Sequence, residues 1–185
     1  MFRKMQFYQR MLLIMVAWLG LIAAPQAFAY KQITAGDAHT CGLKNDGSAI
    51  CWGSNGSGQS TVPNGIFIQL SAGASHTCGL KSDGSAICWG AGENKNIGSH
   101  PFERGQSIVP IGTFTQLSAG LVHTCGLKSG GNVTCWGGGK TTIEAGVNNN
   151  SLELGQSIDP VGTFIQLSAS TYSTCGLKDN LSVTC

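Results

Sequence analysis

Four stretches of the chain alternate apolar and polar residues, a period that is typical of half-buried β-strands. They read YKQITAG from Tyr30, FIQLSAG from Phe67, FTQLSAG from Phe114 and FIQLSAS from Phe164. Each is followed by two further short apolar runs that are joined by a turn sequence. No stretch after residue 29 shows a sustained 3.6-residue period, so the pattern predicts an all-β chain without a long helix.

The two further runs belong to one closely repeated phrase, which in its first copy reads HTCGLKNDGSAICWG. Asn45–Gly47 predicts a three-residue hairpin loop whose glycine adopts the left-handed conformation. In that register Cys41 faces Cys51 across the two strands, at a separation that a disulfide can bridge. We therefore expect each cysteine pair to close its own hairpin, and the pairs are Cys41–Cys51, Cys78–Cys88, Cys125–Cys135 and Cys175–Cys185.

The same register leaves both faces of the hairpin apolar. The two cysteines share one face with Leu43 and Ala49, whereas Ile50 and Trp52 lie on the other. A sheet that is apolar on both faces must be covered on both, and the stacked blades of a β-propeller provide this cover. We expect four-stranded antiparallel blades, in which the stretches GQSTVP, GQSIVP and GQSIDP supply the fourth strand and the tryptophans pack between blades.

The cysteine pairs recur with periods of 37, 47 and 50 residues. Self-similarity with such a period predicts a solenoid or a propeller. The expected units are residues 30–66, 67–113 and 114–163, followed by a partial fourth unit at 164–185. These units amount to about three and a half blades.

Residues 1–29 have the order of a secretory signal peptide. Arg3, Lys4 and Arg10 precede an apolar run from Met11 to Ala24, and the small-residue site Ala27–Ala29 follows. The alternative is an uncleaved membrane anchor, but the run is shorter than the roughly 20 residues that span a bilayer. We expect cleavage after Ala29, no stable membrane span in the product, and a periplasmic or extracellular protein.

The charge of the product argues against nucleic-acid binding. Three of the 11 basic residues belong to the expected signal peptide, so the remainder has 8 basic and 9 acidic residues and a net charge of −1 with neutral histidines. Such a chain has little positive charge with which to neutralise phosphates. All eight cysteines lie in the exported part, where an oxidising compartment favours disulfides.

The F-x-Q-L-S-A-G strand, H-T-C-G-L-K, the D-G turn, and C-W-G followed by G-Q together resemble the repeats of the regulator of chromosome condensation family, in its bacterial, cysteine-bearing form. The resemblance covers residues 30–185. It implies a propeller, typically of seven blades, that serves as a rigid platform for protein partners. Members of the family include nucleotide exchange factors for small GTPases and β-lactamase inhibitors.

Three and a half blades leave open sheet edges, which natural proteins avoid. We expect the sequence to be a truncated reading frame or a fragment of a longer protein. The alternative is that two copies associate to complete a ring, because symmetric homodimers are common.

The recurring histidines invite comparison with metal and catalytic sites. His39, His76 and His123 each precede a cysteine by two residues, as zinc ligands could. The fourth unit keeps its cysteines but has Ser173 in place of histidine, so we expect structural histidines that hydrogen-bond a neighbouring strand. No catalytic constellation is evident, and we expect no enzyme activity, no cofactor and no metal.

Variation in length between units is confined to one place, between C-W-G and G-Q. The second unit inserts AGENKNIGSHPFER there and the third inserts GGKTTIEAGVNNNSLEL. Insertions of this kind map to one face of a repeat protein, often its binding face, although they can also be merely tolerated. The expected partner-binding residues are Glu93, Asn94, Lys95, Asn96, Arg104, Lys140, Glu144, Asn148, Asn149 and Glu153.

These observations predict an exported, non-enzymatic scaffold that binds a protein or a cell-surface ligand. The resemblance to β-lactamase inhibitors gives one alternative, an inhibitor of a periplasmic or cell-wall enzyme. The resemblance to nucleotide exchange factors gives another, an exchange-factor-like effector.

The intact mass of the secreted product tests the signal peptide and the cystines together. We expect the mass of a chain that begins at Tyr30. The protein should take up no alkylating agent before reduction, and all eight cysteines should be alkylated after reduction. A product that retains residues 1–29, or that reacts with the alkylating agent while oxidised, would contradict this interpretation.

Overall fold

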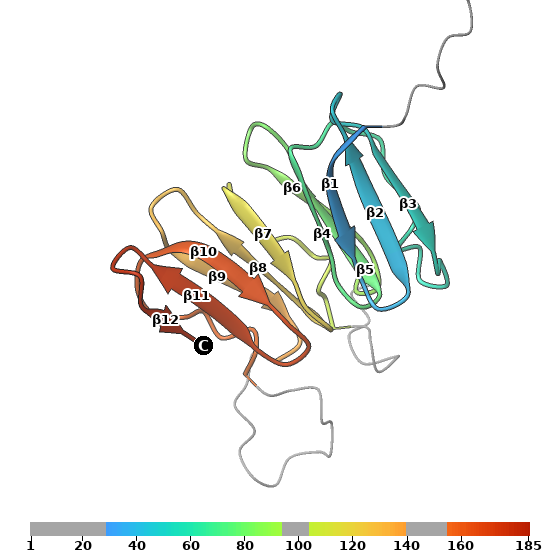
Figure 1. Cartoon of the computed structure of the whole chain (residues 1–185). Coiled ribbons are helices and arrows are strands. Elements are labelled where there is room, and N and C mark those ends of the chain that lie inside the picture. Colours follow the sequence, from blue (N-terminus) through green and yellow to red (C-terminus); the bar gives the residue numbers. More distant parts are fainter. Residues whose placement is uncertain (1–28, 94–103, 140–154) are drawn as a thin grey trace, which may run out of the picture.

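The computed structural model describes residues 29–93, 104–139 and 155–185, and it arranges their strands as four antiparallel sheets of three strands each (Figure 1). We call the sheets blades 1 to 4. Blade 1 consists of β1 (Tyr30–Ala35), β2 (His39–Lys44) and β3 (Ala49–Gly53), and blade 2 of β4 (Gln69–Ala72), β5 (His76–Leu80) and β6 (Ala86–Gly90). Blade 3 consists of β7 (Gln116–Ala119), β8 (His123–Leu127) and β9 (Val133–Gly137), and blade 4 of β10 (Phe164–Ala169), β11 (Thr174–Lys178) and β12 (Val183–Thr184). The described residues therefore form the all-β, blade-like architecture that the sequence predicts.

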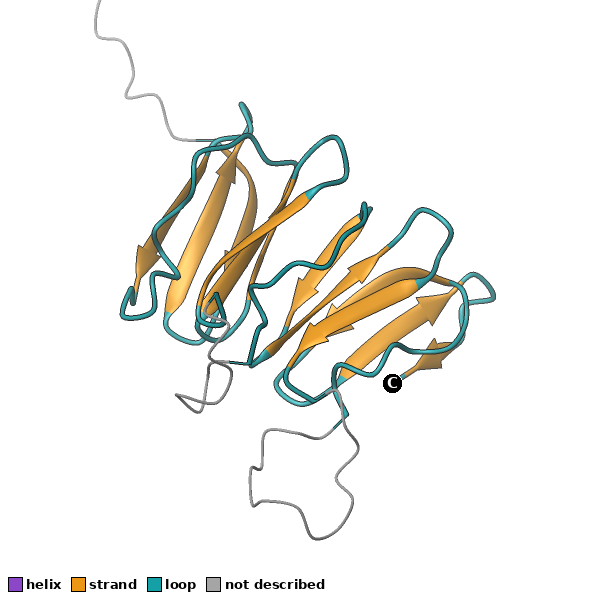
Figure 2. Ribbon diagram, turned by 180° about the vertical axis from the view of Figure 1, so that it is seen from behind, coloured by secondary structure: helices purple, strands orange, loops and turns teal. Residues whose placement is uncertain are grey.

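The four sheets are stacked side by side (Figure 2), and the first strands of successive blades contact one another. Side chains join these inner strands. The Gln32 amide donates to the Leu70 carbonyl and accepts from the Leu70 N–H, both at 2.8 Å, and the Thr34 hydroxyl accepts from the Ala72 N–H at 3.1 Å. Gln69 and Gln116 repeat the amide contact at the next two interfaces.

The hairpins have the predicted register. Cys41 pairs with Cys51 across β2 and β3, and all four expected disulfides are present, with Cα–Cα separations of 4.0–4.1 Å. Gly47 closes the first hairpin loop at φ 83°, the left-handed conformation that the loop requires. In blade 4 the corresponding residue is Leu181, at φ 65°.

The expected fourth strand is not formed. The stretch around Gln59 is a turn, in which Gly58 has φ 82° and the Thr61 N–H donates to the Gly58 carbonyl at 2.9 Å. The Gln59 side chain also accepts from the Ser57 N–H at 2.9 Å. Local bonds of this kind offer the backbone a competing partner to a strand ladder, and here they replace it. The prediction of four-stranded blades was therefore wrong, because each described blade has three strands.

Apolar packing between blades always joins the same two faces. We call the cystine side of a blade its trailing face and the tryptophan side its leading face. Between blades 1 and 2, the trailing-face residues Cys41 and Leu43 pack against Phe67, Leu70 and Trp89 of the next leading face. Corresponding clusters lie between blades 2 and 3 and between blades 3 and 4. This confirms the predicted role of Trp89 and Trp136, both of which are buried. For Trp52 the prediction was wrong, because its side chain is 46% exposed and its ring lies against Tyr30 of its own blade.

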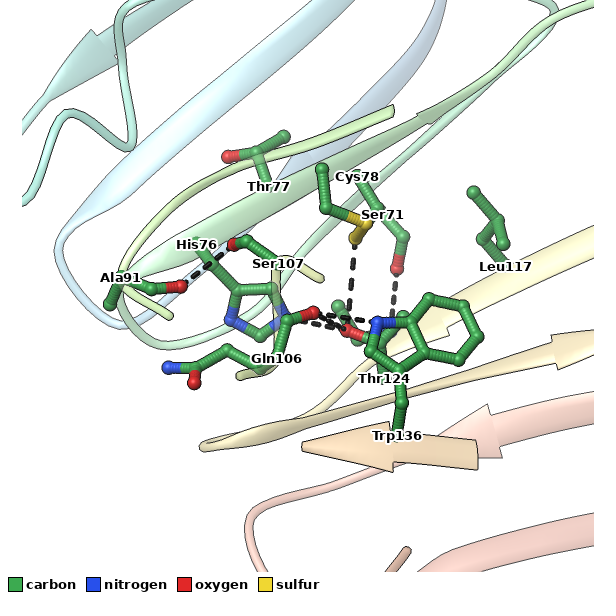
Figure 3. The surroundings of a disulfide bond; sticks show 12 residues. Ser71, His76, Thr77, Cys78, Ala91, Gln106, Ser107, Leu117, Thr124 and Trp136 are labelled. Atoms are coloured by element: carbon green, nitrogen blue, oxygen red, sulfur yellow. Dashed lines mark hydrogen bonds between the residues drawn. A yellow bond between two sulfur atoms is a disulfide. The ribbon is translucent and has the colours of Figure 1, made fainter. Parts of the chain in front are cut away.

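Each histidine of the repeated phrase reaches the next blade through a chain of hydrogen bonds. Figure 3 shows the second copy, in which His76 Nε2 lies 2.8 Å from the Thr124 hydroxyl and that hydroxyl donates to the Gln106 carbonyl at 3.1 Å. The Trp136 indole N–H donates to the same carbonyl at 2.8 Å. Because Thr124 uses its proton on Gln106, it accepts from His76, which assigns the neutral Nε2–H tautomer to the imidazole. This confirms the expectation of structural histidines that bond a neighbouring strand.

Burial keeps these imidazoles neutral. Desolvation lowers the pKa of His76 to about 3, with a smaller contribution from His123 and His39, and desolvation lowers that of His123 to about 4. The pKa of His39 is also lowered by burial, against a smaller opposite effect of Asp37. The Nδ1 atoms of all three have no hydrogen-bond partner among the described residues. A proton added at Nδ1 would therefore remain buried without compensation.

Glycines in the turns after the inner strands let the blades approach closely. A Cβ on Gly73 would overlap both the carbonyl oxygen of Gly120 in the next blade and the ring of His76 below it. Gly36 and Gly120 are in the same situation, facing the carbonyl oxygens of Gly73 and Ser170. The backbone separation at each interface therefore depends on the absence of a side chain at these positions.

Replacing Gly73 by Ala should destabilise the protein by about 1–3 kcal/mol, because the new methyl group meets backbone atoms that cannot move aside alone. Urea unfolding at neutral pH measures the effect. Gly56→Ala is the matched control, because nothing lies within 4 Å of the added carbon. Equal stability of the two variants would contradict the close approach of the blades.

The free energy of unfolding should fall as the pH drops from 7 to 5. In this range the unfolded chain protonates its histidines, with a pKa near 6.5, while His76 and His123 stay neutral in the folded chain. Each of these two histidines therefore lowers the folding equilibrium constant by about tenfold per pH unit below pH 6.5. Hydrogen bonds from Ser48 and Ser85 lower the pKa of Asp46 and Asp83, so protonation of these carboxylates affects the free energy of unfolding only at lower pH. Urea titrations at several pH values test this, and His76→Gln should reduce the dependence. Constant stability from pH 7 to 5 would contradict the buried neutral histidines.

Candidate partner-binding face

Strand pairing brings two kinds of segment to one end of the blades. His39, which follows the first turn of blade 1, pairs with Gly53 at the end of β3, and the same pairing recurs in blades 2 and 3. We call this end the turn face, because it carries the turns at residues 36–38, 73–75, 120–122 and 170–173. The opposite end, which carries the hairpin loops, is the hairpin face. The segments that leave the third strands therefore emerge on the turn face.

Hydrogen bonds fix the roots of both sequence insertions on the turn face. Directly after β6 the Ala91 N–H donates to the Ser75 carbonyl at 2.8 Å, and after β9 the Gly138 N–H donates to the Val122 carbonyl at 2.8 Å. After each insertion, where the chain comes back to the blade, a serine hydroxyl bonds the segment that left it. The Ser107 hydroxyl donates to the Ala91 carbonyl at 2.7 Å, and the Ser157 hydroxyl donates to the Gly138 carbonyl. Both ends of each insertion are thus tied to the same blade.

Two of the residues expected to bind a partner lie in these roots. Glu93 is exposed and Arg104 is partly buried, with its N–H donating to the Gln106 side chain at 2.9 Å. The other expected residues lie outside the part of the chain that the structure describes, and they are Asn94, Lys95, Asn96, Lys140, Glu144, Asn148, Asn149 and Glu153.

A cavity of about 230 Å³ opens on the same face, where the turns of all four blades converge. In each turn the residue directly after the glycine or serine lines this cavity. Its identity differs from blade to blade: it is Asp37, Ala74, Leu121 or Thr171. We call it the axial pocket. The scaffold thus displays an acidic, a small, an apolar and a hydroxyl residue from equivalent positions, an arrangement that suits recognition by a rigid platform.

A second cavity, of about 360 Å³, lies beside β12 and is lined by residues that include Gln156 and Thr174. Their counterparts in blade 3, Gln106 and Thr124, surround the indole of Trp136. This cavity therefore corresponds to a position of core packing, and we assign it no ligand.

The described residues offer no arrangement for metal binding. No group of three or more His, Cys, Asp or Glu side chains in ranges 29–93, 104–139 and 155–185 is placed to hold a metal ion. The zinc hypothesis also fails on chemistry, because all eight cysteines form disulfides. In the same ranges no helix is long and apolar enough to cross a membrane.

Sequence reasoning identified the insertions but missed the axial pocket. The signal was present, since the residue after T/S-A-G/S varies completely among the four units while its surroundings repeat. Its meaning depended on knowing that the four turns meet at one place, which the spacing along the chain does not reveal.

Comparison with known proteins supports the same architecture. The family model described as the regulator of chromosome condensation (RCC1) repeat matches residues 30–59, 67–95 and 114–140. No curated protein matches the chain.

Several solved structures share the fold. The ectodomain of the Physcomitrella patens receptor kinase CR4 is 30% identical with a TM-score of 0.62, over 84% of this chain and 37% of that one. The CRINKLY WD40 ectodomain of the Arabidopsis thaliana receptor kinase ACR4 is 25% identical with a TM-score of 0.57, over 89% of this chain and 53% of that one. Saccharomyces cerevisiae Prp20p, at 14% identity and a TM-score of 0.60 over 86% of this chain and 45% of that one, shows the fold alone.

The chain spans between 37% and 53% of the length of these three structures. The repeats that match the family model are the first three described blades, with their cystine hairpins and the tryptophans that follow them. By its repeats and by its fold, the chain therefore belongs to the regulator of chromosome condensation repeat family.

Proposed function

We propose that this protein is an exported, non-enzymatic scaffold that binds a partner protein or a cell-surface ligand on its turn face. One observation carries the proposal. The roots of both insertions and the axial pocket lie on the same face, although they come from different parts of each repeat. Loops on a rigid scaffold are where recognition usually resides.

The rigidity of the face supports this role. Disulfides close every blade, and the histidine chains and the glycine contacts join neighbouring blades directly beneath the turns. A binding surface that is already ordered loses little conformational entropy when a partner docks. Four disulfides also suit an oxidising, extracellular environment.

The hairpin face offers a contrast within the same molecule. Its first three loops have nearly one sequence, NDG, SDG and SGG, and the aspartates of the first two serve the turn itself. Asp46, for example, accepts from both the N–H and the hydroxyl of Ser48, at 2.9 and 2.7 Å. Polar residues that are used within the loop contribute less to recognition, so the hairpin face serves as the internal control.

The two faces can be compared by site-specific photo-cross-linking. A photoreactive amino acid replaces one exposed acidic residue at a time, at Asp37 and Glu93 on the turn face and at Asp46 and Asp83 on the hairpin face. In the native exported protein we expect adducts from positions 37 and 93 at least fivefold above those from 46 and 83. An excess of unmodified protein should reduce the yield of these adducts by competing for the partner.

The outcome separates the proposal from its competitors. Equal adduct yields on both faces, or adducts from the hairpin face alone, would contradict the assignment of the turn face. Mass spectrometry of the adduct also tells which alternative holds, because a periplasmic or cell-wall enzyme as the captured partner would indicate an inhibitor. Assay of that enzyme with the Asp37 and Glu93 variants would then complete the comparison.

A further inference from the structure

Two asparagines in the segment that connects blades 1 and 2 are each followed by a glycine. The pairs are Asn55–Gly56, in the turn after β3, and Asn64–Gly65, ahead of β4. All four residues are exposed, so water reaches both pairs. Because the two pairs match in sequence and exposure, the surrounding structure decides how differently they react.

An asparagine that precedes a glycine can lose its side-chain amide without an enzyme. The backbone nitrogen of the glycine gives its proton to a base and attacks the side-chain carbonyl carbon of the asparagine. The new N–C bond closes a succinimide ring, and the side-chain nitrogen leaves as ammonia. Water then opens the ring at either of its two carbonyl groups, which yields aspartate or isoaspartate. Glycine favours the attack because it has no Cβ to obstruct the approach of the two groups.

Hydrogen bonds hold the Asn55 side chain away from this reaction. Its Oδ1 accepts from the Ser60 N–H at 2.9 Å and from the Thr61 hydroxyl at 3.2 Å, and its Nδ2 donates to the same hydroxyl at 3.0 Å. The Asn55 carbonyl also accepts from the Gly58 N–H at 3.0 Å, which closes the turn. Attack by the Gly56 nitrogen requires the side-chain bonds to break first.

The segment around Asn64 has no such restraint. Within the part of the chain that the structure describes, no hydrogen bond involves the Asn64 side chain or the backbone of residues 62–66. The chain is next fixed at Phe67, whose N–H donates to the Gly47 carbonyl at 2.8 Å. Asn64 can therefore turn its side-chain carbonyl towards the Gly65 nitrogen without losing a hydrogen bond.

The corresponding connectors of the later blades lack this pair. The three connectors read PNG, PIG and PVG at equivalent places, so Ile111 and Val161 occupy the position of Asn64. The reactive position is therefore confined to the first connector, where the neighbouring Ile66 side chain lies beside Gly47 of the first hairpin loop.

We propose that Asn64 is a site of spontaneous modification in the folded protein, converted by loss of ammonia and uptake of water to aspartate or isoaspartate, and that Asn55 is protected. The product carries an additional negative charge beside the first hairpin loop. Isoaspartate also adds a methylene group to the main chain ahead of Phe67, which packs between blades 1 and 2. The proposal is independent of partner binding on the turn face.

Peptide mapping with fragment-ion sequencing measures both sites over time in the purified, oxidised protein held at pH 8. Replacement of the amide NH₂ by OH changes the peptide mass, and isoaspartate separates from aspartate by chromatography. We expect Asn64 to react about tenfold faster than Asn55, because the loss of two hydrogen bonds adds to the barrier at Asn55. In the reduced protein unfolded in guanidinium chloride, the two sites should react at similar rates.

Two variants serve as controls. Asn64→Gln keeps the charge and should abolish the fast product. Thr61→Val removes the hydroxyl that bonds Asn55 while nearly preserving shape, so it should accelerate the reaction of Asn55 several-fold and leave that of Asn64 unchanged. The inference is overturned if Asn64 reacts no faster than Asn55 in the folded protein, if their difference persists in the unfolded chain, or if Thr61→Val leaves Asn55 as slow as before.

Discussion

The architecture depends on how closely consecutive blades approach one another at the turn face. At that end of each interface a glycine admits the carbonyl oxygen of the next blade, and the histidine beneath it bonds the next blade's threonine. The threonine hydroxyl donates a hydrogen bond to the carbonyl oxygen of a glutamine in the connecting segment. In two of the interfaces the same carbonyl oxygen also accepts from the indole N–H of Trp89 or Trp136. One buried polar network therefore joins two blades and their connector, and its partners are 18 to 51 residues apart in the sequence.

This constraint determines what the molecule can present to a partner. Because the turns are held against one another, their variable residues converge on the axial pocket, and the roots of the insertions are fixed beside them. The disulfides act within blades and the histidine chains act between them. The first make each hairpin rigid, and the second place the hairpins relative to each other.

Local features of this fold could be predicted from the sequence. A ten-residue cysteine spacing around a three-residue loop leaves one hairpin register, so Cys41–Cys51 and its counterparts followed directly. The fourth strand was predicted wrongly because the stretch around Gln59 was assigned to complete a four-stranded blade, whereas side-chain bonds to the local backbone form a turn there. The partner of each histidine and the axial pocket could not be derived, because both arise only when separate repeats are packed together.

The measurement that most directly tests the role of the histidine network is the side-chain ¹⁵N spectrum of the folded, oxidised protein between pH 7 and 5. The account predicts that His39, His76 and His123 show the neutral Nε2–H tautomer, and that His76 and His123 keep it to pH 5. Their Nε2–H protons should exchange slowly with water because they are buried and bonded to threonine. Protonation of His76 near pH 6.5, or the Nδ1–H tautomer at any of the three, would contradict the network.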